Sequence, residues 1–109
     1  MADIRSILVE AVEKQASDVH INVGLKPIIR VNTELIETKF PVITGSDAKE
    51  IVLSLVGQER FDKFEKNRDL DFSTSISDPN KRFRVNAHYQ RDTVALSFRL
   101  ISEVVPTLD

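Results

Sequence analysis

The stretch that decides the fold covers residues 83–100 and reads FRVNAHYQRDTVALSFRL. Its two halves alternate in phase about a loop centred on Arg91 and Asp92, which predicts a β-hairpin. One face of this hairpin is apolar and pairs Phe83 with Leu100, Val85 with Phe98, Ala87 with Leu96, and Tyr89 with Val94. The other face pairs Arg84 with Arg99, Asn86 with Ser97, His88 with Ala95, and Gln90 with Thr93. A slip of one residue would mix the two faces, so the register is well specified.

The predicted register places Arg84 directly opposite Arg99. Their Cβ atoms should then lie about 5 Å apart, where like charges oppose folding unless an anion lies between them. The pair therefore suggests a site for a phosphate or a carboxylate. The alternative is that both arginines extend into water from a solvated face, and the hairpin geometry alone does not separate these two interpretations.

Length and composition limit the class of protein. A chain of 109 residues forms a single domain with one modest core, and 41% hydrophobic with 29% charged residues is typical of an ordered globular protein. The net charge of −2 argues against a general nucleic-acid binder, whose domains are usually strongly basic. Cysteine is absent, and the sequence shows neither a signal peptide nor an apolar run near the roughly 20 residues of a membrane span. We therefore expect a cytoplasmic protein.

The hydrophobic pattern predicts the remaining elements. Helical spacing begins at Ile4 after Asp3, which is placed as an N-cap, and a second helix follows Thr44 and ends at Gly57. Further expected elements are strands at 18–23, 28–31 and 35–36, a short helix at 58–66, and strands beginning near residues 70, 82 and 93. This order predicts an α+β domain, with helices packed on a mostly antiparallel sheet and a C-terminal three-stranded meander.

Five stretches, taken together, resemble the N-terminal domain of type IV pilus retraction ATPases, the PilT-like members of the secretion ATPase superfamily. Their order and spacing agree along nearly the whole chain. They are residues 16–21 (ASDVHI), 29–32 (IRVN), 69–73 (DLDFS), 82–91 (RFRVN through QR), and 98–101 (FRLI) with 106–108 (PTL). The sequence departs from the family at two turns, where Asn32-Thr33 stand in place of a common Asp-Gly pair and Asp92 stands in place of a common glycine.

The resemblance implies a PAS-like domain over residues 1–102 and, over residues 103–109, the start of a linker to a RecA-like ATPase domain that is missing from this chain. In that family the full protein is a hexamer that hydrolyses ATP to retract pili, as in twitching motility. The resemblance implies that Arg84 and Arg99 act as arginine fingers toward the ATP of a motor domain. We also expect an interface role for Arg82, Arg91, His20 and Asn86. His20 lies on the polar face of its strand, and the alternative for it is a structural hydrogen bond to a neighbouring residue.

The implied partners are the RecA-like motor domains of the same and of a neighbouring subunit, together with a pilus platform protein at the inner membrane, but no nucleic acid. The protein would then be cytoplasmic and peripheral at the inner membrane. No G-x-x-x-x-G-K-[ST] loop is present in the sequence, so we expect no cofactor in this fragment and no ATP hydrolysis by it. We also expect no metal, because the two histidines have no matching carboxylate motif. The resemblance implies that ATP and Mg²⁺ bind to the full-length protein.

The sequence is less consistent with two other functions. A free-standing PAS-like sensor of small ligands or proteins would need a roomy apolar cavity, whereas Phe61, Phe64, Phe72, Phe83 and Phe98 are numerous enough to fill the interior. An RNA-binding module would need exposed aromatic side chains on its sheet, and the polar hairpin face has none. Among the smaller sites, Asp69 and Asp71 are expected to balance Arg68 or to face the basic hairpin, and His88 is expected to be solvated.

Overall fold

The computed structural model describes residues 3–77 and 80–101, so the expected linker at 103–109 and most of the turn before residue 80 lie outside the described residues. Within these residues, one six-stranded antiparallel sheet, in the order β3-β2-β1-β6-β5-β4, packs against three helices. The elements are α1 (Ile4–Glu13), β1 (Asp18–Asn22), β2 (Ile28–Val31), β3 (Glu34–Glu37), α2 (Gly45–Val56), α3 (Gln58–Asn67), β4 (Asp69–Ser77), β5 (Asn80–Gln90) and β6 (Thr93–Ile101). The expected α+β class is confirmed.

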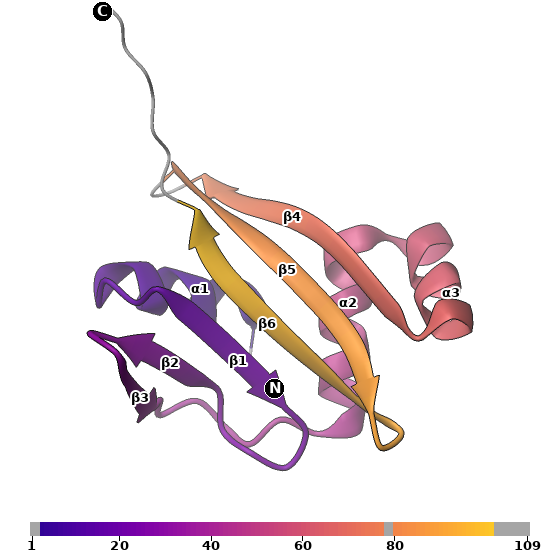
Figure 1. Ribbon diagram of the computed structural model, residues 1–109, viewed down its shortest axis with the longest axis horizontal. Coiled ribbons are helices and arrows are strands. Elements are labelled where there is room, and N and C mark those ends of the chain that lie inside the picture. The colour runs from indigo at the N-terminus through magenta and orange to yellow at the C-terminus, as the bar shows by residue number, and fades with distance from the viewer. Residues whose placement is uncertain (1–2, 78–79, 102–109) are drawn as a thin grey trace, which may run out of the picture.

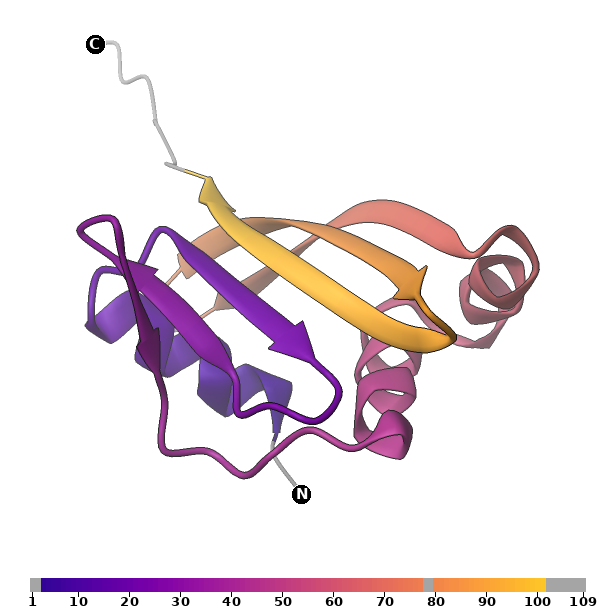
Figure 2. The same cartoon turned by 60° about the horizontal axis from the view of Figure 1, so that its bottom comes forward.

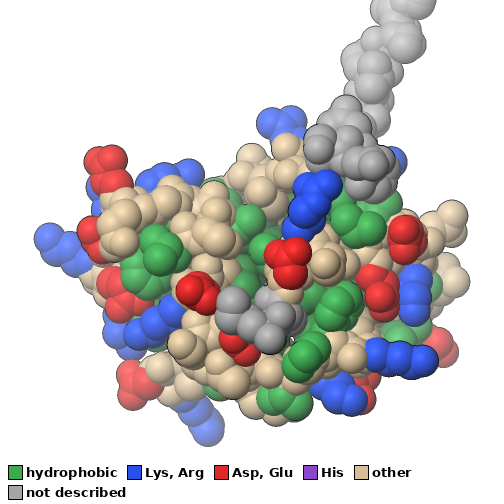
Figure 3. Space-filling view, turned by 180° about the vertical axis from the view of Figure 1, so that it is seen from behind, with side chains coloured by type: hydrophobic (Ala, Val, Ile, Leu, Met, Phe, Trp, Pro, Cys, Tyr) green, Lys and Arg blue, Asp and Glu red, His purple; other side chains and the backbone are tan. Residues whose placement is uncertain are grey.

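All three helices lie on one side of the sheet, and the other side is open (Figures 1 and 2). Seen from behind, the helical side shows apolar patches among scattered charges of both signs (Figure 3). Within residues 3–77 and 80–101, no helix has both the length and the apolar character needed to cross a bilayer.

The centre of the sheet is the pairing of β1 with β6, two strands from opposite ends of the chain. Val19 lies opposite Phe98 and Asp18 opposite Arg99 in this antiparallel pair. The pairing joins an N-terminal meander, β1–β3, to a C-terminal meander, β4–β6. The sequence predicts each meander from local alternation but does not predict which strands meet at the junction.

The β5–β6 hairpin has the expected register at all eight pairs, including Arg84 opposite Arg99. Its turn residues Arg91 and Asp92 have φ angles of 53° and 68°, and the β2–β3 turn has 51° and 69° at Asn32 and Thr33. Positive φ at both central positions is the requirement of a type I′ hairpin turn. Both turns therefore keep the two-residue geometry that glycine would favour, with less permissive residues.

Local capping fixes where two of the helices begin. The side chain of Asp3 accepts a hydrogen bond from the backbone N–H of Arg5 at the start of α1. At the start of α2, Thr44 and Asp47 form a capping box in which each side chain accepts from the other's backbone N–H at 3.0 Å. Gly57, with a φ of 88°, ends α2 and precedes α3. These predicted caps are confirmed.

The core lies between the helices and the inner face of the sheet. Phe83 and Phe98 meet edge to face there, with ring centroids 6.4 Å apart, and both are fully buried. Phe64 of α3 is also fully buried, whereas Phe61 and Phe72 are half-buried and pack against the margin of the core. Three of the five expected core aromatics therefore fill the interior, and two cover its edge.

A cluster around Tyr89 connects the hairpin end to α3. The Tyr89 ring stacks on Phe64 with centroids 5.1 Å apart, and its hydroxyl donates to Glu65. The Arg68 guanidinium lies 4.0 Å from the centroid of the same ring and forms an ion pair with Asp92 at 3.2 Å. Arg68 is thus paired with Asp92 of the hairpin turn, so the structure does not show the first of the two alternatives expected for Asp69 and Asp71, a pairing with Arg68.

This cluster predicts an unusual alkaline titration. Burial, followed by the hydrogen bond to Glu65 and the negative charge of that residue, raises the pKa of Tyr89 to about 12. The pKa of Tyr89 in the folded state lies above its unfolded value of about 10. The contribution of Tyr89 to the free energy of unfolding is therefore fully present below pH 10 and is lost as the pH rises through 12. Tyr89 is the only tyrosine, so phenolate absorbance reports on it alone. We expect the absorbance titration to have its midpoint near pH 12 in buffer and near pH 10 in denaturant. A midpoint near pH 10 for the folded protein would contradict the described contacts of Tyr89.

Candidate anion-binding site

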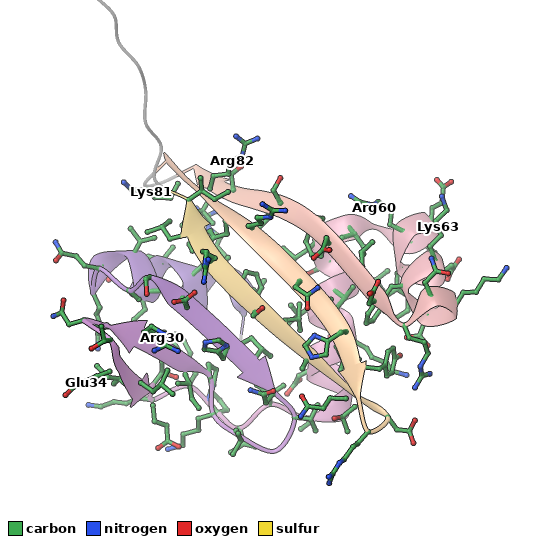
Figure 4. All side chains as sticks on the ribbon, viewed as in Figure 1. Arg30, Glu34, Arg60, Lys63, Lys81 and Arg82 are labelled. Atoms are coloured by element: carbon green, nitrogen blue, oxygen red, sulfur yellow. The ribbon has the colours of Figure 1, made fainter. Side chains whose placement is uncertain are left out.

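A row of four charged side chains crosses the open face of the sheet. Arg30 of β2 lies opposite Asp18 of β1, Asp18 lies opposite Arg99 of β6, and Arg99 lies opposite Arg84 of β5. Adjacent strands are about 4.8 Å apart, so this row, here called the arginine row, spans roughly 14 Å. In Figure 4, which views the open face, Arg30 is labelled on β2.

Asp18 is the fixed point of the arginine row. Its side chain is 15% exposed, and its Oδ2 accepts a hydrogen bond from Ser17 Oγ at 2.8 Å and lies 3.4 Å from Arg30 Nε. Its Oδ1 lies 3.5 Å from Arg99 Nε. Each carboxylate oxygen therefore meets one guanidinium through its Nε atom, and these contacts leave the terminal nitrogens of both arginines for other partners.

Arg84 and Arg99 are open to an approaching anion. The Arg99 side chain is 78% exposed in spite of its contact with Asp18, and Arg84 is exposed as well. Across the described ranges 3–77 and 80–101, no carboxylate forms an ion pair with Arg84. Three guanidinium groups against one carboxylate leave the row with a net charge of +2, which favours binding of a phosphate.

A shallow hollow lies beside the two exposed arginines. Its volume is about 290 Å³, and it is lined by Asp71, Arg84, Val85, Asn86, Ser97 and Arg99. A second hollow of about 370 Å³ adjoins it, since Arg84 and Asp71 line both. Both hollows are open to solvent. The surface is therefore better suited to meet a phosphate presented by another surface than to enclose a free small molecule.

A polar network lies next to the arginine row. Asn86 Nδ2 donates to Asp71 Oδ1 at 2.9 Å, and Asn86 Oδ1 lies 2.8 Å from His88 Nδ1. Asp71 therefore faces the basic hairpin through Asn86, as expected. His88 is half-buried and hydrogen-bonded, which corrects the expectation that it is solvated. His20 lies opposite Ser97 on the same open face.

The structure brings most of the predicted site residues together. Arg82 is exposed near the start of β5, lines the second hollow with Arg84, and is labelled in Figure 4. His20 and Asn86 share the open face with the arginine row. Arg91 lies apart, because it forms the hairpin turn at the far end of β5. An interface that included all four residues would have to extend along the full length of the hairpin.

Sequence reasoning missed the roles of Asp18 and Arg30. Both positions lie in stretches that support the family resemblance, and both alternate with buried Val19 and Ile29. That alternation places them on the polar face, which is a usable signal. Their proximity to Arg99, however, depends on the β1–β6 pairing, which links residues about 80 positions apart in the chain.

The helical side has a different hollow that does not suit an anion. It measures about 410 Å³, lies between the start of α1 and one side of α2, and is lined by Asp3, Ile4, Asp47, Glu50, Ile51, Leu53 and Ser54. Three carboxylates at its edge repel negative ligands. The open face of the sheet is therefore the better candidate for a phosphate site.

Comparison with known proteins agrees with the fold and with the resemblance, although no family model matches the chain. The "Type IV pilus ATPase PilU" of Pseudomonas aeruginosa is 32% identical over 98 residues, which are 90% of this chain and 25% of PilU. The crystal structure titled "Pilus Retraction Motor PilT and Bound ADP" superposes with a TM-score of 0.85 at 33% identity, over 97% of this chain and 31% of that one. The chain is homologous to the N-terminal domain of PilT-like ATPases.

The PilT-like relation extends over almost the whole chain. The "Type IV pilus retractation ATPase PilT" of Pseudomonas aeruginosa is 29% identical over 107 residues, 98% of this chain and 31% of PilT. The ATPase DotB of Legionella pneumophila has the same fold, with a TM-score of 0.80 at 20% identity. The chain spans between a quarter and a third of the length of these proteins.

Proposed function

We propose that this chain is the N-terminal regulatory and interface domain of a hexameric type IV pilus retraction ATPase that serves twitching motility. In this proposal the arginine row faces the ATP bound by a RecA-like motor domain. The observation that supports it most is the pair Arg84 and Arg99, adjacent and exposed on an open sheet face, in a chain homologous to PilT-like ATPases.

The chemistry follows from the guanidinium group. Negative charge on the γ-phosphoryl oxygens is stabilised by donors that are already in place when the bond to the leaving group breaks. Arginine suits this role because its planar fork can bind two phosphate oxygens at once. If the fingers belong to a domain that moves, the site is complete only when that domain is docked, and hydrolysis is then coupled to rotation of the domain.

The motor domain would supply what this chain lacks. None of the three glycines of the 109-residue chain belongs to a phosphate-binding G-x-x-x-x-G-K-[ST] loop, so ATP and Mg²⁺ would be held elsewhere in the full-length protein. The partners in this proposal are the motor domains of the same and of a neighbouring subunit, and a platform protein at the inner membrane. The protein would be cytoplasmic and peripheral to that membrane.

The first test separates the fragment from the complete protein. We expect the purified 109-residue chain to release no phosphate from ATP, and the protein encoded by the complete reading frame to contain a phosphate-binding loop after residue 109 and to hydrolyse ATP. Phosphate release is measured for both at equal molar concentration, with a variant lacking the loop lysine as the blank. ATP hydrolysis by the short chain, or a reading frame without the loop, would refute the proposed function.

A further inference from the structure

Asp18 is an unexpected neighbour for a phosphate site. A carboxylate within about 10 Å of a bound anion should weaken its binding roughly two- to fourfold through charge repulsion in a high-dielectric surface environment. Asp71, which lines the hollow and has Asn86 as its hydrogen-bond partner, is a carboxylate of this simple kind. Asp18 differs from Asp71 because it contacts the site through an arginine.

The contacts of Asp18 define one orientation of Arg99. Arg99 lies on β6, between Asp18 on β1 and the hollow that β5 and β6 line with Arg84, Asn86 and Ser97. Asp18 meets the Nε atom of Arg99 from β1, which lies on the other side of β6 from β5. An arginine held at Nε still has both terminal nitrogens free to bind two oxygens of a phosphate.

Asp18 is itself held in place from the other side. Ser17 donates to Oδ2 at 2.8 Å, and Arg30 Nε lies 3.4 Å from the same oxygen. Because Arg30 and Ser17 bind one carboxylate oxygen, the other is directed to Arg99. The positive charge of Arg30 also offsets the repulsion that Asp18 exerts on an anion.

We propose that Asp18, held by Arg30 and Ser17, is a positioning residue that orients Arg99 for phosphate. This inference rests on the proposed function, because it assumes that the open face meets a phosphate. A side chain as long as arginine otherwise costs about 0.5–1.5 kcal/mol to immobilise when it binds, which corresponds to a factor of about 2 to 12 in affinity. Because Asp18 already orders the Arg99 side chain in the folded protein, this cost does not have to be met when the phosphate binds.

The test compares two carboxylates of the open face, of which Asp18 contacts Arg99 and Asp71 does not. The probe is inorganic pyrophosphate at low ionic strength, titrated into the 109-residue chain and followed by NMR, with expected dissociation constants in the millimolar range. Asp71→Asn removes a charge and should strengthen binding. Asp18→Asn removes the same charge and frees Arg99, so we expect it to bind pyrophosphate at least about twofold more weakly than Asp71→Asn does.

A second measurement reports on Arg99 without any ligand. The Nε–H signal of Arg99 should shift and exchange faster with water in Asp18→Asn and should stay unchanged in Asp71→Asn. A purely structural role for Asp18 would lower the melting temperature but would change neither the ratio of the two dissociation constants nor this signal selectively. Equal or tighter binding by Asp18→Asn relative to Asp71→Asn would overturn the positioning role.

A further arm separates this inference from the proposed function. Arg84→Gln should weaken pyrophosphate binding whatever Asp18 does, because Arg84 contacts the hollow directly. If the wild-type chain shows no shifts on the open face, or if Arg84→Gln binds as the wild type does, the phosphate-facing role fails and the inference fails with it. If Arg84→Gln weakens binding but the two carboxylate variants bind alike, the positioning role of Asp18 alone is refuted.

Discussion

Replacing Arg84 by glutamine in the complete protein should lower the kcat of ATP hydrolysis by about 10³-fold, the lower end of the range for arginine fingers. In the described part of the chain no ion pair holds Arg84, so its charge is available to a phosphate. KM should change little, because the lost interaction strengthens as charge develops in the transition state. Steady-state phosphate release at saturating ATP measures the effect, and Arg99→Gln should act in the same direction.

The matched control is Lys63→Gln. Lys63 is exposed on α3 and is labelled in Figure 4. Its replacement by glutamine removes the same charge as Arg84→Gln but leaves the open face of the sheet unchanged. We expect this variant to hydrolyse ATP at the wild-type rate. Circular dichroism should show that all the variants remain folded. A wild-type rate for Arg84→Gln would remove Arg84 from the proposed site and leave Arg99 to be judged separately.

Replacing Phe98 by alanine should lower the free energy of unfolding of the 109-residue chain by about 3–5 kcal/mol. Phe98 is fully buried on β6, lies opposite both Val19 and Val85, and meets Phe83 edge to face. Its removal leaves a cavity at the junction of the two meanders. A domain of this size has about 5–15 kcal/mol of stability in total, so a large fraction would be lost.

Urea denaturation followed by far-ultraviolet circular dichroism measures this loss, with an unchanged slope against urea if the folded structure is kept. Leu35→Ala is the control, since Leu35 is an apolar residue of β3 with 59% of its surface exposed. We expect Leu35→Ala to change the free energy of unfolding by no more than about 0.5 kcal/mol. Similar losses for the two variants would show that the described core does not stabilise the domain as the burial indicates.

Elements that depend on neighbouring residues could be predicted from the sequence. The hairpin register follows from alternation on both sides of a two-residue turn, so the opposition of Arg84 and Arg99 was predictable before any coordinates. The capping box of Thr44 and Asp47 is likewise a local signal. These interactions join residues that the turn or the helix already holds together.

The rest of the site depends on contacts between distant segments. Nothing in the local pattern of β1 selects β6 as its partner, and without that pairing Asp18 cannot be placed beside Arg99. The ion pair of Arg68 with Asp92 could not be predicted for the same reason, because it requires α3 to pack beside the hairpin turn. Charge alone left Arg68 and the basic hairpin as alternatives for Asp69 and Asp71, and the structure shows the hairpin for Asp71.

The junction of β1 with β6 also has a consequence for synthesis on the ribosome. Val19 and Phe98 are 79 positions apart, so at about 5–20 residues per second the partner of β1 is translated roughly 4–16 s after β1 itself. During that interval the edge of β1 in the β1–β3 meander has no partner strand, and Val19 has no Phe98 to pack beside it. We expect this nascent segment to need chaperone protection until the final strand emerges and closes the sheet.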